Sequence, residues 1–441
     1  MLPSLSLKLP RRANDADIVG LDVQPGLIAA VKARVNGSIL AERAAAQPLG
    51  PDTMREGEVA DVDALTEALR EMFSGSGLGK RVRIGIANQR TVMRTLDLPP
   101  VTDRKELAAA VRFQAQDQVP MPLSNAVLDF HPLGLHDTPA GSRQRVVLVA
   151  AQRDMVERLL SAVRAAGLTP EGVDLSAFAL IRSLYDRAEG EEGRVLYLNV
   201  DGLTNLAIAE GTSCRFTRVI GGGVESMATD LAARRGIPLT DARALLASVD
   251  LSVPVVPAPV IAEAAQAAAE ATPAPGEDSP PAVAVPLADQ LPGSEPQDTP
   301  ASEQEPTLSQ DEHEQRERSM GYAETISAAQ VAAQPAAPAQ AQADSDEDIR
   351  AVLENSVREI AGEVRNSMDF HRTQEQGGEV SHVALSGGVL DLPGFAEALQ
   401  AALGTEVRKE VVGLVDAELE GKVSTHRLAV AAGLAATEAP R

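Results

Sequence analysis

The sequence predicts an α/β fold that consists of two similar halves, and three observations predict it. The order strand, turn, strand, turn, strand, helix occurs twice, once from residue 18 and once from residue 194. A compact segment of mixed helix and strand patterns lies between the two occurrences. Residues 251–345 have a composition unlike the rest of the chain and interrupt the second half.

The first half begins with an apolar strand at 18–23. A turn at 24–26 leads into a second strand, and Asn36–Gly37 is a strong signal for a β-hairpin to a third strand. A helix is expected from Val62 to Phe73, because apolar residues recur there at three- and four-residue spacing.

The second half repeats this order from the strand Arg194–Val200. Turns at Asp201–Gly202 and Glu210–Gly211 lead into two further strands. The three glycines at 221–223 then open a helix that we expect to run to Arg234, and a helix N-terminus favours anions. Two matching units predict a duplicated architecture with a ligand cleft between the halves.

Between the halves the sequence predicts an inserted α+β subdomain. Its helix spans 103–119 and is stopped by Pro120 and Pro122. The elements expected after it are strands at 127–131 and 145–151, a helix at 155–166 and a strand at 168–173.

Composition excludes several classes of protein. Hydrophobic residues make up 44% of the 441, and the absence of Trp with only 2% aromatic residues predicts aliphatic cores. A net charge of −23 argues against nucleic-acid binding, which requires a basic surface. No run approaches the roughly 18 apolar residues of a membrane span, and residues 1–16 lack a signal-peptide pattern and are predicted to be a flexible tail. The single cysteine, Cys214, excludes internal disulfides and fits a reducing cytoplasm.

Residues 251–345 are predicted to be a disordered, solvated insertion. They hold 14 of the 29 prolines and 15 acidic residues against only Arg316 and Arg318, a net charge of −13. Such a segment buries too little apolar surface to offset the entropy of the chain. A short helix at 261–270 is expected within it, and a binding role for the segment stays open.

The stretch Val383–Leu399 ends an apolar strand in two glycines, Gly387 and Gly388. It also predicts a helix that starts at Pro393, since proline suits a first helical turn. Two explanations of the glycine pair stay open. Either it is a tight strand-to-helix turn, or a flat ligand lies against its bare backbone.

Taken in order, motifs along the chain resemble the PilM-type type IV pilus assembly proteins, which are relatives of the cell-division protein FtsA in the actin-like ATPase class. They cover nearly the whole chain except the tail and the insertion. The matching motifs are Val19-Gly-Leu-Asp22, Val111-Arg-Phe-Gln-Ala-Gln116, Val119-Pro-Met-Pro122, Val147-Leu-Val-Ala-Ala151, Gly167-Leu-Thr-Pro170, Val173-Asp-Leu-Ser-Ala-Phe178, Thr204-Asn-Leu206, Arg365-Asn-Ser-Met-Asp-Phe370, Leu385-Ser-Gly-Gly388, Leu392-Pro-Gly394 and Leu428-Ala-Val-Ala-Ala-Gly-Leu434.

The resemblance implies an actin-like, ribonuclease-H-like two-lobe fold with an α+β subdomain inserted in the first lobe and a long disordered insertion in the second. The segments expected are a flexible tail (1–16), a first lobe (17–98), the inserted subdomain (99–178), the first part of the second lobe (179–250), the disordered insertion (251–345) and the completion of the second lobe (346–441).

The resemblance also implies a cleft for ATP and Mg²⁺ between the lobes. Asp22 would face the Mg²⁺ through water, and the turn 201–204 would form the second phosphate loop, while the glycine pair would lie on the adenosine side. The implied nucleotide-site residues are Asp22, Gly26, Asn199, Gly202, Thr204, Asn205, Gly221, Gly222, Gly387 and Gly388.

Both phosphate loops depart from the family pattern. Family members read Gly-Ser-Ser-Ser and then Lys, where this chain has Gln24-Pro-Gly-Leu-Ile28 and then Ala29. In the second loop the usual Asp is Asn199 and the usual Gly is Asp201. Each lost charged hydrogen bond is worth on the order of 1.5–3 kcal/mol. Either the loops bind nucleotide weakly, or they remain only as tight turns, and little or no hydrolysis is expected.

By the same resemblance, the chain is a scaffold of pilus assembly. It would grip the N-terminal tail of a membrane-anchored PilN-like protein in a groove between the first lobe and the inserted subdomain, in the cytoplasm at the inner face of the membrane. Phe113 and Val119 are the candidate contacts, although each is equally explained as core. Other pilus platform proteins are expected partners, and self-association stays open.

Two other functions stay open. An actin-like ATPase or kinase needs a catalytic base, for which only Asp22 and Asp201 are well placed. An FtsA-like cell-division protein usually carries a basic amphipathic membrane helix at its C-terminus, and residues 436–441 do not have that pattern.

Overall fold

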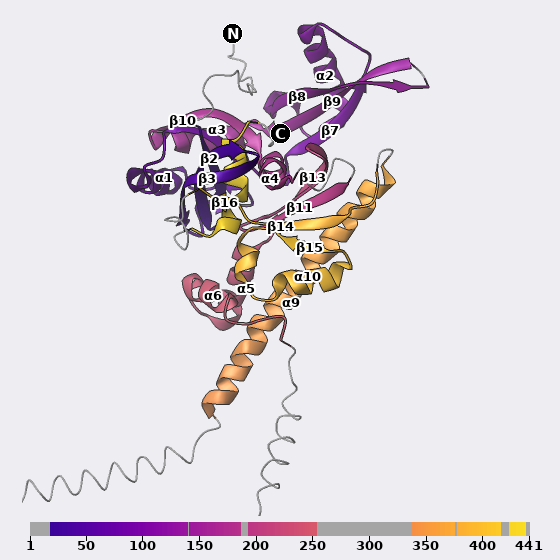
Figure 1. Cartoon of the computed structure of the whole chain (residues 1–441). Helices are drawn as coiled ribbons and strands as arrows, with labels where there is room; N and C mark the ends of the chain where they lie inside the picture. The colour runs from indigo at the N-terminus through magenta and orange to yellow at the C-terminus, as the bar shows by residue number, and fades with distance from the viewer. Residues whose placement is uncertain are drawn as a thin grey trace, which may run out of the picture. The chain divides into compact units, whose positions relative to one another are not determined.

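Figure 1 shows a computed structural model of the chain, which describes residues 18–139, 141–186, 193–253, 337–374, 377–415 and 423–437. Side chains of the helix that begins at residue 337 are described from residue 346 on. The chain divides into two units, Met1–Val253 with Asp346–Arg441, and Pro254–Ser345. The tail, most of the predicted insertion and the helix expected at 261–270 lie outside the described residues.

A six-stranded sheet forms the first lobe, in the order β10-β6-β1-β2-β3-β16. Its strands are β1 (Val19–Gln24), β2 (Leu27–Asn36), β3 (Ser38–Pro48), β6 (Arg81–Ile86), β10 (Thr169–Leu175) and β16 (Gly413–Leu414). The first three strands form an antiparallel meander, and its second turn is the predicted hairpin, where Gly37 has a φ of +71°. On the other side of β1, β6 and then β10 run parallel to it.

A five-stranded sheet forms the second lobe, in the order β13-β12-β11-β14-β15. Its strands are β11 (Arg194–Val200), β12 (Thr204–Glu210), β13 (Ser213–Ile220), β14 (His382–Ser386) and β15 (Val407–Lys409). Here too an antiparallel meander of three consecutive strands is followed, beside its first strand, by two parallel strands. The two sheets therefore share one topology, and the predicted duplicated two-lobe fold is confirmed.

Two helices, α4 (Ser176–Leu184) and α11 (Ala429–Ala435), pack between the sheets. Their buried residues form one aliphatic cluster with β2 of the first sheet and with β11, β12 and β14 of the second. The packing is close enough to need glycine, since a Cβ at Gly433 would lie 1.8 Å from the carbonyl oxygen of Ala179.

Other helices cover the outer faces of the two sheets. Helices α1 (Val62–Ser76) and α3 (Arg153–Ala165) share a core with the first sheet, and α5 (Val224–Arg235), α6 (Leu239–Leu246), α9 (Ala337–Thr373) and α10 (Phe395–Leu403) share one with the second. The carboxylate of Asp61 caps the N-terminus of α1, and Gly77 ends that helix in the left-handed conformation. The short elements are β4 (Met54–Arg55), β5 (Glu58–Val59), and the 3₁₀ helices η2 (Leu123–Asn125), η4 (Gly388–Asp391) and η6 (Thr425–Leu428).

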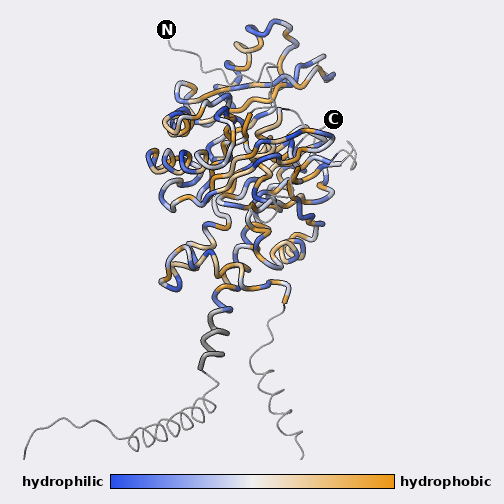
Figure 2. Tube along the Cα trace, turned by 60° about the vertical axis from the view of Figure 1, so that its left-hand side comes forward, coloured by the Kyte–Doolittle hydropathy of each residue, from blue (hydrophilic) through white to orange (hydrophobic). Residues whose placement is uncertain are grey.

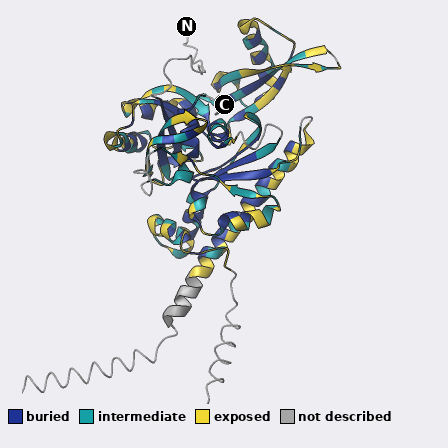
Figure 3. Cartoon of the chain, viewed as in Figure 1, coloured by how far each residue is buried: buried dark blue, intermediate teal, exposed yellow. Residues whose placement is uncertain are grey.

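The inserted subdomain is a three-stranded antiparallel sheet with one helix on its face. Its strands β7 (Val92–Leu98), β8 (Ala126–Thr138) and β9 (Gly141–Gln152) lie in the order β7-β9-β8. Helix α2 (Arg104–Gln118) buries Leu107 and Val111 against this sheet, and Asp103 caps it by accepting two backbone N–H bonds. The far end of the β8–β9 hairpin is exposed, as the yellow ribbon in Figure 3 shows.

Four segments differ from the predictions. The predicted subdomain, 99–178, includes α3 and β10, which the structure places on the first sheet because β10 pairs in parallel with β6, and also α4, which packs between the two sheets. Similarly, β16 pairs with β3 and α11 packs on β1, so part of the predicted second-lobe segment belongs to the first sheet. Residues 337–345 of the predicted insertion form the first turns of α9.

The expected helix start at Pro393 is wrong. The 3₁₀ helix η4 follows directly after Gly387, and α10 begins only at Phe395. Gly394 is its N-cap residue with a φ of +75°, a conformation that favours glycine, and so the proline stands before the cap.

Candidate functional site

The first of the two implied phosphate loops, which begins at Gln24, comes shortly after a buried carboxylate in the chain. Asp22 lies in β1, is 3% exposed, and accepts a hydrogen bond from Nε2 of Gln24 at 2.5 Å. Burial raises the pKa of Asp22 to about 7 although this hydrogen bond lowers it, and the Asp201 carboxylate adds to the rise. The first and second lobes therefore bring two carboxylates close together.

Hydrogen bonds within the chain hold the second turn. The Asp201 N–H donates to the Leu203 carbonyl at 3.0 Å, and the Thr204 hydroxyl donates to the Gly222 carbonyl at 2.9 Å. The Val224 N–H, at the start of α5, donates to the Asp201 carbonyl at 2.7 Å. Asn199 and Asn205, which face each other across β11 and β12, are also buried.

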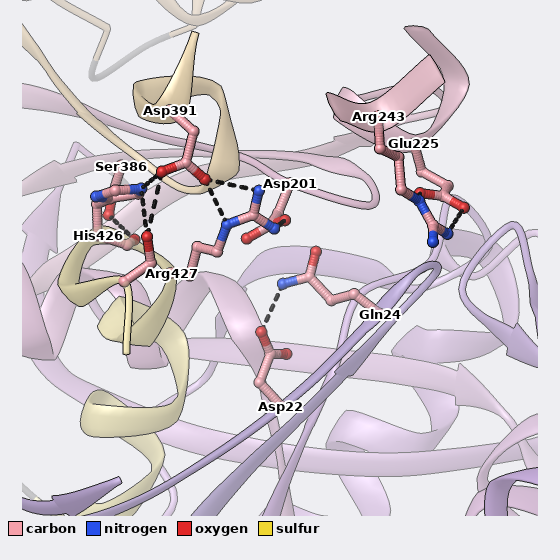
Figure 4. Close-up of polar contacts among 10 residues, drawn as sticks. Asp22, Gln24, Asp201, Glu225, Arg243, Ser386, Asp391, His426 and Arg427 are labelled. Carbon is pink, nitrogen blue, oxygen red and sulfur yellow. Dashed lines mark hydrogen bonds and ion pairs between the residues drawn. The ribbon is translucent and has the colours of Figure 1, made fainter. Parts of the chain in front are cut away.

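The two turns touch through their glycines. A Cβ added at Gly202 would lie 2.1 Å from the carbonyl oxygen of Pro25. A Cβ at Gly26, whose φ is +79°, would lie 2.5 Å from a carboxylate oxygen of Glu225 in α5. That carboxylate forms an ion pair with Arg243, with Nε to Oε2 at 2.9 Å (Figure 4).

The structure answers the question raised by the glycine pair. Gly387 has a φ of +97° and packs on the backbone of Val200, where a Cβ would lie 2.5 Å from the carbonyl oxygen. A Cβ at Gly388 would lie 2.5 Å from Cζ of Arg427. A flat group does lie against Gly388, and it is the Arg427 guanidinium of the same chain.

Arg427 connects two carboxylates, as Figure 4 shows. Its Nη1 donates to Oδ1 of Asp201 at 3.0 Å, and its Nε donates to Oδ2 of Asp391 at 2.8 Å. His426 Nε2 lies 2.8 Å from the other Asp391 oxygen, and the Ser424 hydroxyl donates to that oxygen at 3.2 Å. We call Asp201, Asp391, Ser424, His426 and Arg427 the arginine cluster.

The cluster sets the protonation of its two carboxyl groups. Burial raises the pKa of Asp201 to about 6, against the opposing effects of Arg427 and of a hydrogen bond from the Gly388 N–H. Burial would also raise the pKa of Asp391, but the His426 hydrogen bond and the Arg427 charge bring it down to about 2.

Most of the predicted nucleotide-site residues lie in this region. Gly221 stands slightly apart, against the side chain of Gln89 from the first lobe. Arg427, Asp391, His426 and Glu225 are not among the residues that the sequence predicted. No local pattern marks them, because Arg427 meets Asp201 across 226 positions of chain. Within the described residues, no group of three or more His, Cys, Asp or Glu side chains is arranged to hold a metal ion.

A separate cavity of about 130 Å³ lies between the inserted subdomain and the first lobe. Its lining comes from β8, β9, β6, α3, β10 and α4 and is mostly aliphatic. The lining residues are Arg83, Ile86, Val127, Asp129, Phe130, His131, Val147, Val149, Ala151, Val156, Gly172, Val173, Asp174, Leu175 and Phe178. Strands β8 and β10 are edge strands of their sheets, so within the part of the chain that the structure describes each has one side without a neighbouring strand.

The charged residues at this cavity differ in their partners. Asp174 forms an ion pair with Arg182 at 2.5 Å, and the Arg83 guanidinium donates to the carbonyls of Leu434 and Ala436. Asp129 accepts only the N–H of Phe130 among the bonds described. Burial raises its pKa, with a partly opposing effect from that hydrogen bond.

The two predicted partner contacts have different environments. Phe113 lies on the outer side of α2 with 71% of its surface exposed, whereas Val119, at the C-cap of α2, is buried in the core of the subdomain. Neither residue lines the cavity.

No described helix has both the length and the apolar character that crossing a membrane requires. Figure 2 shows hydrophobic and hydrophilic residues alternating along the tube.

The profile of the family described as type IV pilus assembly protein PilM matches residues 20–243. Among solved structures, the chain is similar to one in the "PilM-PilN type IV pilus biogenesis complex", with 21% identity, 95% of this chain and 97% of that chain covered, and a TM-score of 0.63. It is also similar to the ethanolamine utilization protein EutJ from Carboxydothermus hydrogenoformans (14% identity, 95% and 88% covered, TM-score 0.43). Another similar structure is MreB5 of Spiroplasma citri bound to AMPPNP (12% identity, 94% of each chain covered, TM-score 0.43). With half of its length matched by the family profile and both sheets in the same duplicated topology, this chain belongs to the type IV pilus assembly protein PilM family.

Proposed function

We propose that the chain is a platform protein of type IV pilus assembly that binds the N-terminal tail of a PilN-like membrane protein. Family membership supports the pilus role, and the similar structure whose name joins PilM with PilN supports the choice of partner. The observation that carries the proposal is the cavity between the inserted subdomain and the first lobe.

The size and the walls of this cavity suit an apolar anchor residue. At about 130 Å³ it is close to the roughly 150 Å³ of an engineered cavity that binds benzene, so it accommodates one large side chain. Aliphatic residues such as Val149, Val173 and Leu175 line it, and burying an apolar side chain there is favourable by about 1.5–3 kcal/mol.

The free strand edges beside the cavity suit the backbone of an extended tail. A tail that adds to the edge of β8 or β10 gains main-chain hydrogen bonds while its alternate side chains reach the cavity. Asp129 offers a carboxylate to the N–H groups of such a tail. A short segment thus gains affinity from pairing and specificity from the anchor.

Binding of this kind would hold the chain at the inner face of the cytoplasmic membrane through its partner. Contacts with other platform proteins and self-association would use surfaces outside the cavity, such as the exposed side of α2 at Phe113.

The experiment is to titrate the full chain with a synthetic peptide of the N-terminal tail of the PilN-like protein from the same genome. Gly172→Leu places a side chain at the cavity, where no atom lies within 4 Å of the added Cβ. We expect it to weaken peptide binding by at least about tenfold, the equivalent of about 1.4 kcal/mol.

Gly75→Leu is the matched control. Gly75 lies exposed near the end of α1, and it too has no atom within 4 Å of an added Cβ. It should leave binding unchanged. If Gly172→Leu leaves peptide binding unchanged, the tail binds outside the cavity. If the unmodified chain does not bind the peptide, the proposed partner is wrong.

A further inference from the structure

At three glycines of the cleft, other atoms of the chain occupy the place where a Cβ would stand. Pro25 lies against Gly202, the Glu225 carboxylate against Gly26, and the Arg427 guanidinium against Gly388. Glycines in nucleotide loops normally let the backbone approach a phosphate. Here they let parts of the same chain approach each other.

Several backbone amides beside the cleft already have acceptors within the chain. The N–H of Gly387 donates to the His426 carbonyl at 2.9 Å, and that of Gly388 donates to the Asp201 carboxylate. The N–H of Gly223, ahead of α5, donates to the Ser226 hydroxyl at 2.9 Å. A nucleotide that used these groups, or the Asp201 N–H and the Thr204 hydroxyl of the second turn, would have to replace existing hydrogen bonds.

The charges of the cleft also oppose a nucleotide. Asp22, Asp201 and Glu225 are carboxylates, and the two cations beside them, Arg427 and Arg243, already form ion pairs with Asp201 and Glu225. The phosphates of a nucleotide would gain a cation from these side chains only if an arginine left its carboxylate partner. The residues present therefore do not fit Mg·ATP.

We propose that Arg427 holds the two lobes of the actin-like cleft together as an internal cation, and that closure of the two lobes in this chain needs no ATP. Arg427 lies in η6, which leads directly into α11, and α11 packs on the first sheet. The two carboxylate partners of Arg427, Asp201 and Asp391, belong to the second lobe. The arginine cluster thus ties the segment that leads to the first lobe onto the turns of the second.

Thermal unfolding of the full chain tests this proposal, with and without millimolar Mg·ATP. We expect no rise in Tm from Mg·ATP for the unmodified chain, since a ligand that does not bind cannot stabilise. Arg427→Ala should lower Tm by roughly 5–10 °C, because it leaves Asp201 and Asp391 without their shared cation. Arg358→Ala, which removes an arginine 65% exposed on α9, is the control and should shift Tm by less than about 1 °C.

A double-mutant cycle covers the case in which Arg427→Ala does not fold. Arg427→Gln and Asp201→Asn should each lower Tm, and the double variant should lose less than the sum of the two losses. Strictly additive losses would overturn the internal-cation role. A rise in Tm of the unmodified chain with Mg·ATP, or its binding of a fluorescent ATP analogue at micromolar concentration, would overturn the closed cleft.

Discussion

Gly20 of β1 lies directly against Ala431 of α11, so that a Cβ on the glycine would stand 1.8 Å from the alanine carbonyl oxygen. The same helix meets α4 through Gly433, at the same distance from Ala179. Helix α11 is therefore in backbone contact with both the first sheet and the neighbouring helix. Small residues, here glycine and alanine, are what this layer between the sheets requires.

Gly433→Ala should destabilise the protein by about 2–3 kcal/mol, because the added methyl group has no space and the helices must separate. Urea unfolding followed by circular dichroism measures the change. Gly362→Ala in α9 is the matched control, since no atom lies within 4 Å of its added Cβ. We expect it to stabilise by about 0.5–1 kcal/mol through helix propensity. Equal effects of the two substitutions would contradict the close packing of α11.

Asp22→Asn should make stability less sensitive to pH. The folded state raises the pKa of Asp22 from 3.8 to about 7, so the unfolded chain releases this proton first as the pH rises. Ionisation then favours the unfolded state, and stability falls between about pH 4 and pH 7. Asparagine stays neutral at every pH, so the advantage of the variant over the unmodified chain should grow by about 2.5 kcal/mol from pH 5 to pH 8.

Denaturation midpoints at the two pH values measure this difference. Asp52→Asn, which removes a surface carboxylate whose side chain is 90% exposed, reports the effect of losing a charge outside the cleft. An advantage of Asp22→Asn that is the same at both pH values would mean that Asp22 is ionised in the folded protein throughout.

Cys214 should react slowly with thiol reagents in the folded state. Burial raises the pKa of this thiol to about 12, and Sγ donates to the Phe216 carbonyl at 3.4 Å. Because the thiolate is the nucleophile, iodoacetamide at pH 8 should modify the native chain far more slowly than the chain in urea. Mass spectrometry of the time course measures both rates, and similar rates would show that this half-buried thiol is accessible in the folded chain.

Alanine substitutions at Phe113 and Val119 should distinguish a surface residue from a core residue. Phe113→Ala is expected to change the free energy of unfolding by less than about 0.5 kcal/mol, because the ring is 71% exposed. Val119→Ala should cost about 1–2 kcal/mol, since that side chain is buried with Val111 and Leu107. A loss of binding to a pilus protein on Phe113→Ala would then report direct contact, because the fold is unchanged.

The sequence was sufficient to predict the duplicated sheets, because their signals are local. The hairpin at Asn36–Gly37, the apolar spacing of α1 and the turn at Asp201–Gly202 each act within a few residues. Their repetition in both halves made the architecture predictable before any contact was known.

Long-range pairings were not predictable in the same way. The placement of β10 beside β6 depends on a parallel pairing, and β10 looks like any short strand of the preceding subdomain. The arginine cluster forms because β11 and β14 are neighbours in the second sheet, which brings Asp201 and Asp391 together at Arg427. A single sequence does not reveal this order of strands. The cavity exists only because β8 and β10 come from two different sheets.

One hydrogen-bonded arginine, Arg350, marks a place where a segment can be inserted into the chain. Arg350 of α9 donates to the carbonyls of Asp250 and Val253 at 2.8 and 2.7 Å, so the main chain leaves the folded unit and returns to it at a single point. Closing a longer loop at such a point costs only about 0.6 kcal/mol for each doubling of its length. We therefore expect that a fluorescent reporter or an affinity tag can be inserted after residue 253 while both lobes keep their fold.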